Sequence, residues 1–481
     1  MSCVDDFVEQ IITADNDYQA LDRIYLYNRI CALVGDDNHQ TNPDLKQALI
    51  DTAITNKKID GSVTSQEILN DQLMDFLTPR PSKVNQEFWN LYQNSPEAAT
   101  NYFYHLSQDN DYIKTKAIAK NISFPVTTDY GDLEITINLS KPEKDPKAIA
   151  AAGRQAQTGY PKCQLCLENE GYLGRLGYPA RSNHRVIRFL LGGQTWGFQY
   201  SPYAYFKEHA IFLNQKHQPM IINQHTFNNL LEIIRIFPQY FVGSNADLPI
   251  VGGSMLSHDH YQGGRHVFPM MKAPIDREIS LPVDQVKAGI VKWPMSTIRL
   301  TSQSPEQLVK AANLIHENWM NYSDETVQIK AYSNETRHHT VTPIAYRVND
   351  QYVLDIVLRD NQTSAQYPDG IFHPHQDVQH IKKENIGLIE VMGRAILPAR
   401  LKNELHQVEL YLLNEPNQMA DYHQTWADQL AKKYHFTAEN VSQLVRKETG
   451  LVFARVLEDA GVFKWDQSGQ TAFDKFIRSL E

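Results

Sequence analysis

Apolar side chains recur at spacings of three and four through the first 120 residues, a period typical of amphipathic helices. The clearest such run spans residues 5–34, with apolar positions at Phe7, Ile11, Ile12, Leu21, Ile24 and Tyr25. Asp44 is a cap for a helix that starts at residue 45, and a serine leads the segment that stops before Pro79. Residues 102–120 look like another helix. We therefore expect residues 1–121 to form a helical extension, and we find no chemical motif in it.

The pattern changes near residue 122. Apolar and polar side chains alternate over residues 133–139, as in a half-buried strand. Strand-like segments then recur at 185–191, 195–200, 210–214, 249–252, 296–300, 342–348 and 353–358. Helical patterns interrupt them at 226–237 and at 305–322, where Ser304 is the expected cap. A turn at 348–351 predicts antiparallel pairing, and the pattern becomes mostly helical again after residue 383. These elements predict an α+β fold.

Composition narrows the class of protein. The chain has 481 residues, enough for two or three domains, with 42% hydrophobic and 21% charged residues, as in ordinary globular proteins. Its formal charge of −10 argues against broad nucleic-acid binding. No apolar run approaches the roughly 20 residues of a membrane span, and no secretory signal is visible at the N-terminus. We expect a cytoplasmic protein with neither a nucleic-acid nor a membrane partner.

Four cysteines are too few for a disulfide framework in so long a chain. Two of them form the motif Cys163-Gln-Leu-Cys166, in which both thiolates can face one tetrahedral ion. A redox dithiol is the competing interpretation, but such a pair is expected at the start of a helix that follows a strand. Here turn-forming residues lie on both sides. Half of a zinc site is the better interpretation.

A glycine-flanked segment carries the sequence His258-Asp-His260-Tyr-Gln262 between residues 252 and 264. In an extended chain, residues two apart lie on the same face, so these three side chains are in line. One imidazole can bind a metal while its neighbour stays free as a nucleophile. His217, at the end of the expected strand 210–214, could complete a zinc site with His258 and the two cysteines.

A CxxC pair, a strand that ends in histidine and a glycine-flanked H-x-H-x-Q together resemble the galactose-1-phosphate uridylyltransferase family of the histidine-triad superfamily. Asp259 replaces the proline of the better-known class, and the helical extension is similar to the second class, found in Gram-positive bacteria. The resemblance covers about residues 122–400. It implies two related antiparallel sheet units packed with helices, at 122–285 and 286–481, and a homodimer.

The family reaction that this resemblance implies is ping-pong. His260 would attack the α-phosphorus of UDP-glucose, release glucose 1-phosphate and hold the uridylyl group, which galactose 1-phosphate would then accept. Gln262 would donate a hydrogen bond to a phosphoryl oxygen. The remaining substrate-binding positions implied by the resemblance are Asn245, Gly252, Gly253 and Ser254.

The same resemblance implies a structural zinc held by Cys163, Cys166, His217 and His258. A site without metal, held by hydrogen bonds, is the alternative. The better-known class binds a second metal, of which Glu278 and His339 would be remnants. Residues 354–358 depart from that pattern, so we expect the second metal to be absent.

Several other features stay open at this point. His373-Pro-His375 is a literal His-Pro-His, but it lacks the glutamine and the preceding glycines, and we assign it to a loop. Residues 387–393 resemble the family's hexose-contacting segment or a core strand. Arginines that follow the CxxC could meet phosphates or lie in solvent; they are Arg175, Arg181 and Arg185.

Two other functions compete with the transferase. A histidine-triad hydrolase or phosphorylase would share His260, but a histidine at position 262 would favour it, and this chain has glutamine. A non-catalytic zinc module would use both histidines as ligands. It predicts that His260→Ala releases the metal and unfolds the protein, whereas the transferase predicts a folded, metal-containing and inactive variant.

Overall fold

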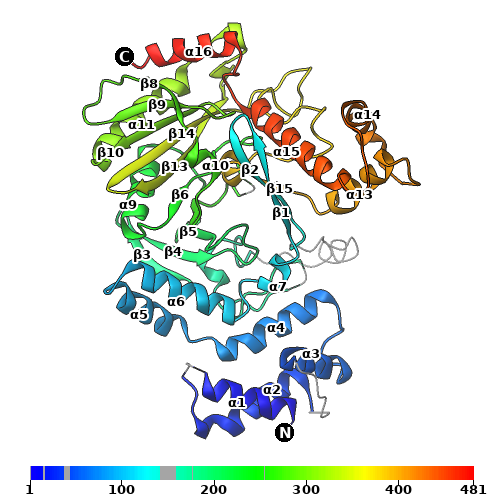
Figure 1. The fold of residues 1–481 in the computed structure, drawn as a ribbon. Coiled ribbons are helices and arrows are strands. Elements are labelled where there is room, and N and C mark those ends of the chain that lie inside the picture. Colours follow the sequence, from blue (N-terminus) through cyan, green and yellow to red (C-terminus); the bar gives the residue numbers. More distant parts are fainter. Residues whose placement is uncertain (1, 15–16, 37–43, 141–158, 176, 254) are drawn as a thin grey trace.

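The structure is a computed structural model that describes residues 2–14, 17–36, 44–140, 159–175, 177–253 and 255–481. Its main feature is an antiparallel sheet of ten strands in the order β3-β4-β5-β7-β6-β13-β14-β10-β9-β8 (Figure 1). In that order the strands are Ile187–Leu191, Gln194–Tyr200, Ala210–Asn214, His260–Gly264, Phe241–Gly243, His339–Val348, Gln351–Asp360, Thr297–Ser302, Lys287–Val291 and Ile275–Ile279.

The large sheet consists of two halves with the same strand order. Each half has a three-stranded meander, then a helix, then two strands of which the second pairs back with the meander. The helices are α9 (Gln224–Ile236) and α11 (Pro305–Asn321). The halves join where β6 pairs with β13, through Gly243 and Ile344. The structure thus confirms an α+β fold with two related antiparallel units, and it shows that they form one continuous sheet.

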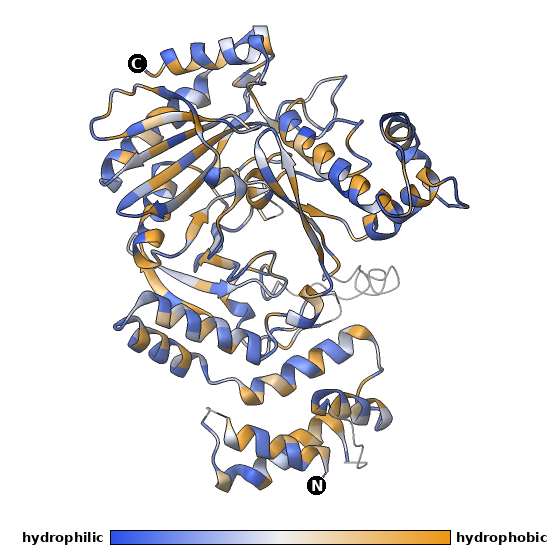
Figure 2. Ribbon diagram, viewed as in Figure 1, coloured by the Kyte–Doolittle hydropathy of each residue, from blue (hydrophilic) through white to orange (hydrophobic). Residues whose placement is uncertain are grey.

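Helices cover one face of this sheet. They are α5 (Pro81–Tyr92), α6 (Pro96–Asp109), α9, α11 and α16 (Gln467–Arg478), and their apolar side chains form one core with the strands. Aromatic rings dominate it, as where Phe88 of α5 meets Phe198 of β4 with ring centroids 6.0 Å apart. Figure 2 shows hydrophobic segments, in orange, along the strands of the large sheet.

The opposite face packs against a smaller sheet and the C-terminal helices. The hairpin β1 (Ile122–Thr128) and β2 (Gly131–Ile137) is joined by β15 (Arg394–Leu397), which runs parallel to β2. Helix α15 (Val441–Ala460) crosses β1 closely because a Cβ at Gly450 would lie 2.5 Å from Val126. The other helices on this side are α10 (Pro269–Lys272), α12 (Leu388–Val391), α13 (Leu401–Leu412) and α14 (Gln424–Lys433).

The first four helices have a small core of their own. They are α1 (Cys3–Thr13), α2 (Arg23–Val34), α3 (Leu45–Thr55) and α4 (Val63–Leu77). The apolar spacing predicts helices here correctly, but Leu21, Ile24 and Tyr25 are exposed. The buried face of α2 carries Leu26, Ile30 and Val34 instead. Ion pairs join α4 to the main body, at 2.7 Å between Asp75 and Arg185 and at 2.9 Å between Asp71 and Lys114.

Two sequence predictions are wrong in detail. The helix expected over 102–120 breaks after Asp109 and resumes as α7 (Thr115–Ile118), with Asp111 in the left-handed region at φ +57°. The strand expected at 249–252 is a turn, in which Ile250 has φ +73°. The caps at Asp44 and Ser304 are confirmed, since the Asp44 carboxylate accepts from the backbone N–H of Gln47 and the Ser304 hydroxyl accepts from the backbone N–H of Gln307. The serine cap expected at Ser65 is wrong, because α4 starts at Val63 and Ser62 caps it.

Short elements complete the described chain. They are the 3-10 helices Ala20–Asp22, Leu167–Asn169, Glu325–Val327 and Asp421–His423, and the two-stranded ribbon of β11 (Tyr332–Ser333) and β12 (Thr336–Arg337). Within the described ranges, none of the helices combines the length and apolar character needed to traverse a lipid bilayer.

Candidate metal centre and active site

Four side chains from three separate segments converge at one end of β5 and β7: Cys163, Cys166, His217 and His258. Their sulfur and nitrogen atoms all lie within 4.8 Å of one another. The two Sγ atoms are 3.5 Å apart, and the Nδ1 atoms of His258 and His217 lie 3.1 and 3.2 Å from Cys163 Sγ and Cys166 Sγ. The structure therefore brings together all four predicted metal ligands.

These separations fit a tetrahedral ion. Bonds of about 2.1–2.3 Å to zinc place neighbouring ligand atoms roughly 3.4–3.8 Å apart. The separations between the sulfurs and the nearest histidine nitrogens run from 3.1 to 3.6 Å, close to those edges. Two thiolates and two imidazoles are also the donor set that structural zinc prefers. The residues present fit a zinc ion.

Hydrogen bonds set the protonation of the cluster. The carbonyl oxygen of Asn214 can only accept a hydrogen bond, so the 2.7 Å contact requires His258 to carry its proton on Nε2. Nδ1 of His258 is then unprotonated and faces the sulfurs. Burial raises the pKa of the Cys166 thiol to about 12. A bound divalent cation would supply the charge that such a thiol needs in order to lose its proton.

The CxxC turn is held by a residue that the sequence analysis missed. The amide nitrogen of Asn169 donates to the carbonyls of both Cys163 and Cys166, each at 2.8 Å. Its oxygen accepts from the hydroxyl of Tyr178 at 2.8 Å. Asn169 is buried, and a single asparagine three residues after a CxxC carries no pattern that would have identified it.

His260 is the first residue of β7, and its ring is locked in one tautomer. Its Nδ1 donates to the carbonyl of His258 at 2.7 Å, because a carbonyl oxygen can only accept. Nε2 therefore carries the lone pair, and the one hydrogen bond of this ring within the described residues is the one from Nδ1. Burial lowers the pKa of His260 to about 4, so the imidazole is neutral at physiological pH.

The side chains of His260 and Gln262 leave the sheet on the face opposite the helical core. Between them, Tyr261 points into that core, where its ring stacks on Trp196 at 5.0 Å and its hydroxyl accepts from Asn229. Since successive side chains of a strand alternate, Tyr261 anchors β7 and directs its neighbours to the other side. The predicted alignment of the two residues is observed.

Gln262 is oriented by a histidine that the sequence analysis did not consider. Its Oε1 accepts from Nε2 of His209 at 3.0 Å, while its Nε2 makes no hydrogen bond within the described part of the chain. His209 precedes β5, whose residue Ile211 pairs with Gln262 across the sheet. The donor nitrogen of the amide is thus free for a ligand.

The loop before His258 is held against α12. Asn245 Oδ1 accepts from the backbone amide of Leu388 at 2.9 Å, which leaves the amide nitrogen as its remaining donor. A Cβ at Gly253 would lie 2.7 Å from that nitrogen, and a Cβ at Gly252 would lie 2.5 Å from the Leu248 carbonyl. Both glycines are therefore needed for the loop to close, and Ser254 lies outside the described residues.

Family models and sequence relatives of this chain name the same family. Residues 16–219 match the N-terminal domain of galactose-1-phosphate uridyl transferase, and residues 232–428 match its C-terminal domain. A galactose-1-phosphate uridylyltransferase of Lactiplantibacillus plantarum is 66% identical over the full length of both chains. The chain belongs to the galactose-1-phosphate uridylyltransferase family. This confirms the resemblance and identifies a nucleotidyltransferase.

Other family members are similar over almost their whole length. The Lacticaseibacillus paracasei galactose-1-phosphate uridylyltransferase is 60% identical over 100% of both chains, and that of Streptococcus pneumoniae is 57% identical over 100% of this chain and 99% of its own. Among solved structures, yeast Ap4A phosphorylase Apa2 in complex with Ap4A matches 75% of this chain and 95% of its own, at 10% identity and a TM-score of 0.38.

Two candidates outside this site have structural partners. Arg185 donates to Asp75 at 2.7 Å and to the carbonyl of Pro79, also at 2.7 Å, and so attaches the N-terminal helices. His375 of the His-Pro-His segment stacks on Tyr367 at 4.1 Å and donates to the carbonyl of Ile371. The second histidine of that segment is therefore part of a packed loop.

Glu278 and His339, the two residues that could be remnants of a second metal site, lie on separate strands. Glu278 is on the edge strand β8, whereas His339 is on β13, with β9, β10 and β14 between them. His339 is fully buried, stacks on Trp319 at 3.9 Å and donates from Nδ1 to the Trp319 carbonyl.

The segment 387–393 is a short helix followed by β15 rather than a single strand. Glu390 in α12 forms a buried ion pair with Lys382 at 2.7 Å and also accepts from the Gly387 amide. Through the hydrogen bond between Asn245 and Leu388, this helix is attached to the loop of the candidate site.

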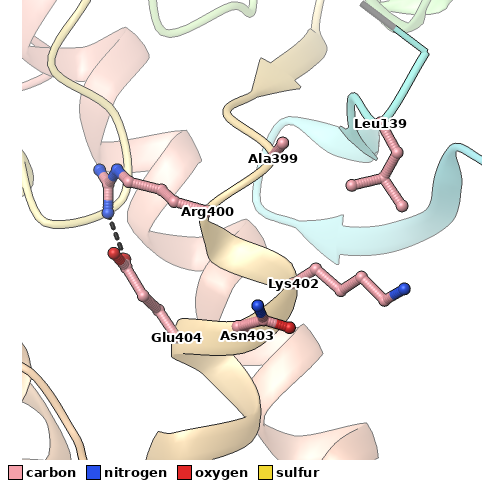
Figure 3. Close-up of a pocket in the computed structure, with 6 residues that line it drawn as sticks. All are labelled: Leu139, Ala399, Arg400, Lys402, Asn403 and Glu404. Carbon is pink, nitrogen blue, oxygen red and sulfur yellow. Dashed lines mark hydrogen bonds and ion pairs between the residues drawn. The ribbon is translucent and has the colours of Figure 1, made fainter. Parts of the chain in front are cut away.

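A cavity of about 540 Å³ lies elsewhere, where the end of β2 meets the start of α13. Figure 3 shows the ion pair of Arg400 and Glu404 on one side of it and Leu139 on the other. None of its lining residues belongs to the Cys/His cluster or to β7, so it is separate from the candidate active site.

Proposed function

We propose that the protein transfers a uridylyl group from UDP-glucose to galactose 1-phosphate through a covalent uridylyl-His260. The observation that carries the proposal is the state of one ring. His260 donates its only proton to the His258 carbonyl and keeps a bare, unpaired Nε2 next to the metal cluster. A neutral, oriented imidazole is the nucleophile that phosphoryl chemistry needs.

The proposed reaction has two matching steps. In the first, the Nε2 lone pair forms a bond to the α-phosphorus, and the bond to the bridging oxygen breaks, with its electron pair leaving on glucose 1-phosphate. In the second, a phosphate oxygen of galactose 1-phosphate attacks the same phosphorus, and the electron pair of the phosphorus–nitrogen bond returns to Nε2. No proton has to leave the imidazole, because Nδ1–H stays bonded to His258 throughout.

Neighbouring groups would bind the phosphates. The free amide nitrogen of Gln262 is placed to donate to a nonbridging oxygen, where negative charge develops during transfer. Asn245 retains one amide donor beside the closed loop of Gly252 and Gly253. We propose that these residues, with Ser254, hold the nucleotide sugar.

We further propose that the metal is zinc, that it is structural and that it is the only metal. Cys163, Cys166, His217 and His258 would hold it, and when bound it would fix the segment that carries the nucleophile. Metal analysis of the purified protein should give one zinc per chain. Two metals per chain, or one metal other than zinc, would contradict this part.

We also propose how the chain divides into units. In this proposal residues 1–121 are the helical extension, 122–285 the catalytic unit and 286–481 the second unit, with β8 at Ile275–Ile279 contributed by the catalytic unit to the second half of the large sheet. We also propose a homodimer. Leu21, Ile24 and Tyr25 have exposed fractions of 94, 75 and 53%, and they offer apolar surface that a second subunit would cover. Sedimentation equilibrium tests this, and a monomer at micromolar concentration would contradict it.

Isotope exchange tests the proposed reaction. Labelled glucose 1-phosphate should enter UDP-glucose in the absence of any galactose 1-phosphate, because the first step is reversible by itself. His260→Ala should abolish the exchange. Formation of UDP-galactose without exchange would exclude the covalent route, and steady release of UMP into water would favour a hydrolase.

A further inference from the structure

We propose that His209 is a positioning residue that fixes the amide of Gln262 so that its nitrogen faces the reacting phosphoryl group. The inference rests on the proposed function, and it extends the site to a residue on a different strand. His209 does not touch the substrate in this account. It acts only through the hydrogen bond between its Nε2 and Gln262 Oε1, which is 3.0 Å long.

The oxygen and the nitrogen of an amide side chain have similar shapes, but the oxygen accepts hydrogen bonds and the nitrogen donates them. Rotation by half a turn would present the Gln262 carbonyl oxygen to a phosphate, where it would repel the developing charge. A donor held against Oε1 prevents that rotation. His209 Nδ1 is buried without a partner among the described residues, so the tautomer with its proton on Nε2 is the one that leaves no buried N–H unpaired. That tautomer donates to Gln262 Oε1 and therefore selects the orientation in which the Gln262 nitrogen is free.

Burial shows that His209 is poorly explained by packing alone. The residue is 4% exposed, and its Nδ1 is buried without a hydrogen-bond partner among the described residues. An unpaired buried nitrogen is unfavourable, and an apolar side chain would fill the same space against Phe206, whose ring centroid is 4.5 Å away, without that cost. Burial lowers the pKa of His209 to about 4, which keeps the ring neutral.

The backbone around His209 is built to hold it. The preceding residue, Glu208, lies in the left-handed region at φ +55°, and its carbonyl would be 2.4 Å from a Cβ on Gly264. Its buried carboxylate accepts from the Tyr240 hydroxyl at 2.6 Å and pairs with Arg265 at 3.2 Å. Gly264 and Arg265, just after Gln262, thus pack against and pair with Glu208, just before His209. These contacts fix the side chains of Gln262 and His209 relative to each other.

Four variants of the full-length protein test the inference. His209→Leu removes the donor, and His209→Gln keeps an N–H at a similar distance. Gln262→Met removes the amide, and His316→Leu is the matched control. His316 is also buried with an unpaired Nε2, but it packs against Phe227 on the helical side of the sheet.

The measurements are kcat, KM for UDP-glucose and the rate at which a single turnover forms the uridylyl enzyme. Gln262→Met should lower kcat by about 10²-fold, as loss of one such donor does. We expect His209→Leu to lower kcat by roughly tenfold with KM changed less than about threefold, since a free amide spends part of its time reversed. His209→Gln should recover most of the loss, and His316→Leu should leave kcat unchanged.

The double variant His209→Leu with Gln262→Met decides the route of action. If His209 acts only through Gln262, the double variant should match Gln262→Met within about twofold. Losses that multiply, or a His209→Leu rate equal to wild type while His260 is still labelled, would overturn this inference alone. Failure of the wild-type protein to form any uridylyl adduct would overturn the proposed function and this inference with it.

Discussion

The two halves of the large sheet place different chemistry at matching positions. Gln262 of β7 pairs with Gly243 of β6, and Asp355 of β14 pairs with Ile344 of β13, the two strands at which the halves meet. In the first half, Nε2 of His260 carries a lone pair without a partner, and the amide nitrogen of Gln262 is free to donate. In the second half the matching positions are Val353 and Asp355.

Every polar atom of the second pair is satisfied. Asp355 accepts from Arg299 at 2.7 Å and 2.9 Å, and it also accepts from the Tyr346 hydroxyl at 3.3 Å. Buried polar groups normally pair in this way, so an unpaired set in a related half is informative. The shared strand order alone therefore does not make a site. The chemistry depends on which half leaves polar atoms without partners.

The largest expected effect comes from removing the nucleophile. His260→Ala should lower kcat by at least about 10⁴-fold, because no other neutral imidazole occupies its place, while the protein stays folded and keeps its zinc. Val353→Ala is the matched change in the other half and should leave kcat within about twofold. Steady-state kinetics and metal analysis measure both, and metal loss in His260→Ala would instead support a zinc module.

Loss of the metal should mainly affect stability. A ligand present at about 1,000 times its Kd contributes about 4 kcal/mol to the free energy of unfolding, and Cys163→Ser should lose most of that contribution. Cys31→Ser, in α2, is the control and should keep its zinc. Denaturant unfolding with and without a chelator compares them. Equal unfolding midpoints for Cys163→Ser and Cys31→Ser would contradict a zinc centre.

Breaking the ion pair of Arg299 and Asp355 in the second half should lower the stability of the protein and leave its activity unchanged. Asp355→Asn leaves the largely buried Arg299 guanidinium without its carboxylate partner, which should lower the free energy of unfolding by about 3 kcal/mol. The kcat per folded molecule should stay near that of wild type. A tenfold loss of kcat with normal stability would show that this half takes part in the chemistry.

The smallest effect concerns the three-stranded sheet of β1, β2 and β15, which packs against the face of the large sheet opposite the helical core. The pKa of Glu134 in β2 lies below its usual range. Burial of the carboxylate acts to raise it, but the hydrogen bond from His266 and the charge of Arg394 have the larger, opposite effect. A lowered pKa means that this carboxylate stabilises the fold at neutral pH, and that the stabilisation is lost as pH falls through its titration range. Glu134→Gln should therefore lower the free energy of unfolding by about 1 kcal/mol at pH 7. The difference from wild type should disappear as pH falls through the lowered titration range of this carboxylate. A difference that stays constant as pH falls would contradict this prediction.

Much of the fold class and of the metal cluster could be predicted from the sequence. Cysteines two residues apart and histidines in a glycine-flanked segment carry a chemical signal that does not depend on the surrounding elements. Three ligands, Cys163, Cys166 and His258, could therefore be named from these motifs. His217 was named because a tetrahedral zinc site needs a fourth ligand, and the structure places it with the other three. Strand alternation and helix caps gave α+β for the same reason, since each is read over a few residues.

Other features depend on contacts that no local pattern encodes. The strands β6 and β7 are short and end in glycine, so they lack the apolar alternation of a strand. The repeat of strand order is invisible in a sequence whose halves have different side chains. His209 and Asn169 are single residues whose roles arise only when distant segments meet. Leu21 and Ile24 have helical spacing but face outward, because periodicity does not say which face is covered.

In the proposed first step, Nε2 of His260 becomes bonded to the phosphorus of a uridylyl group. Incubation with UDP-glucose alone, followed by mass analysis of the intact chain and its peptides, tests this most directly. We predict one added uridylyl group on the peptide that contains residue 260, stable in base, labile in acid and absent from His260→Ala. An unmodified chain that still converts galactose 1-phosphate to UDP-galactose, or a uridylyl group on another residue, would contradict the claim.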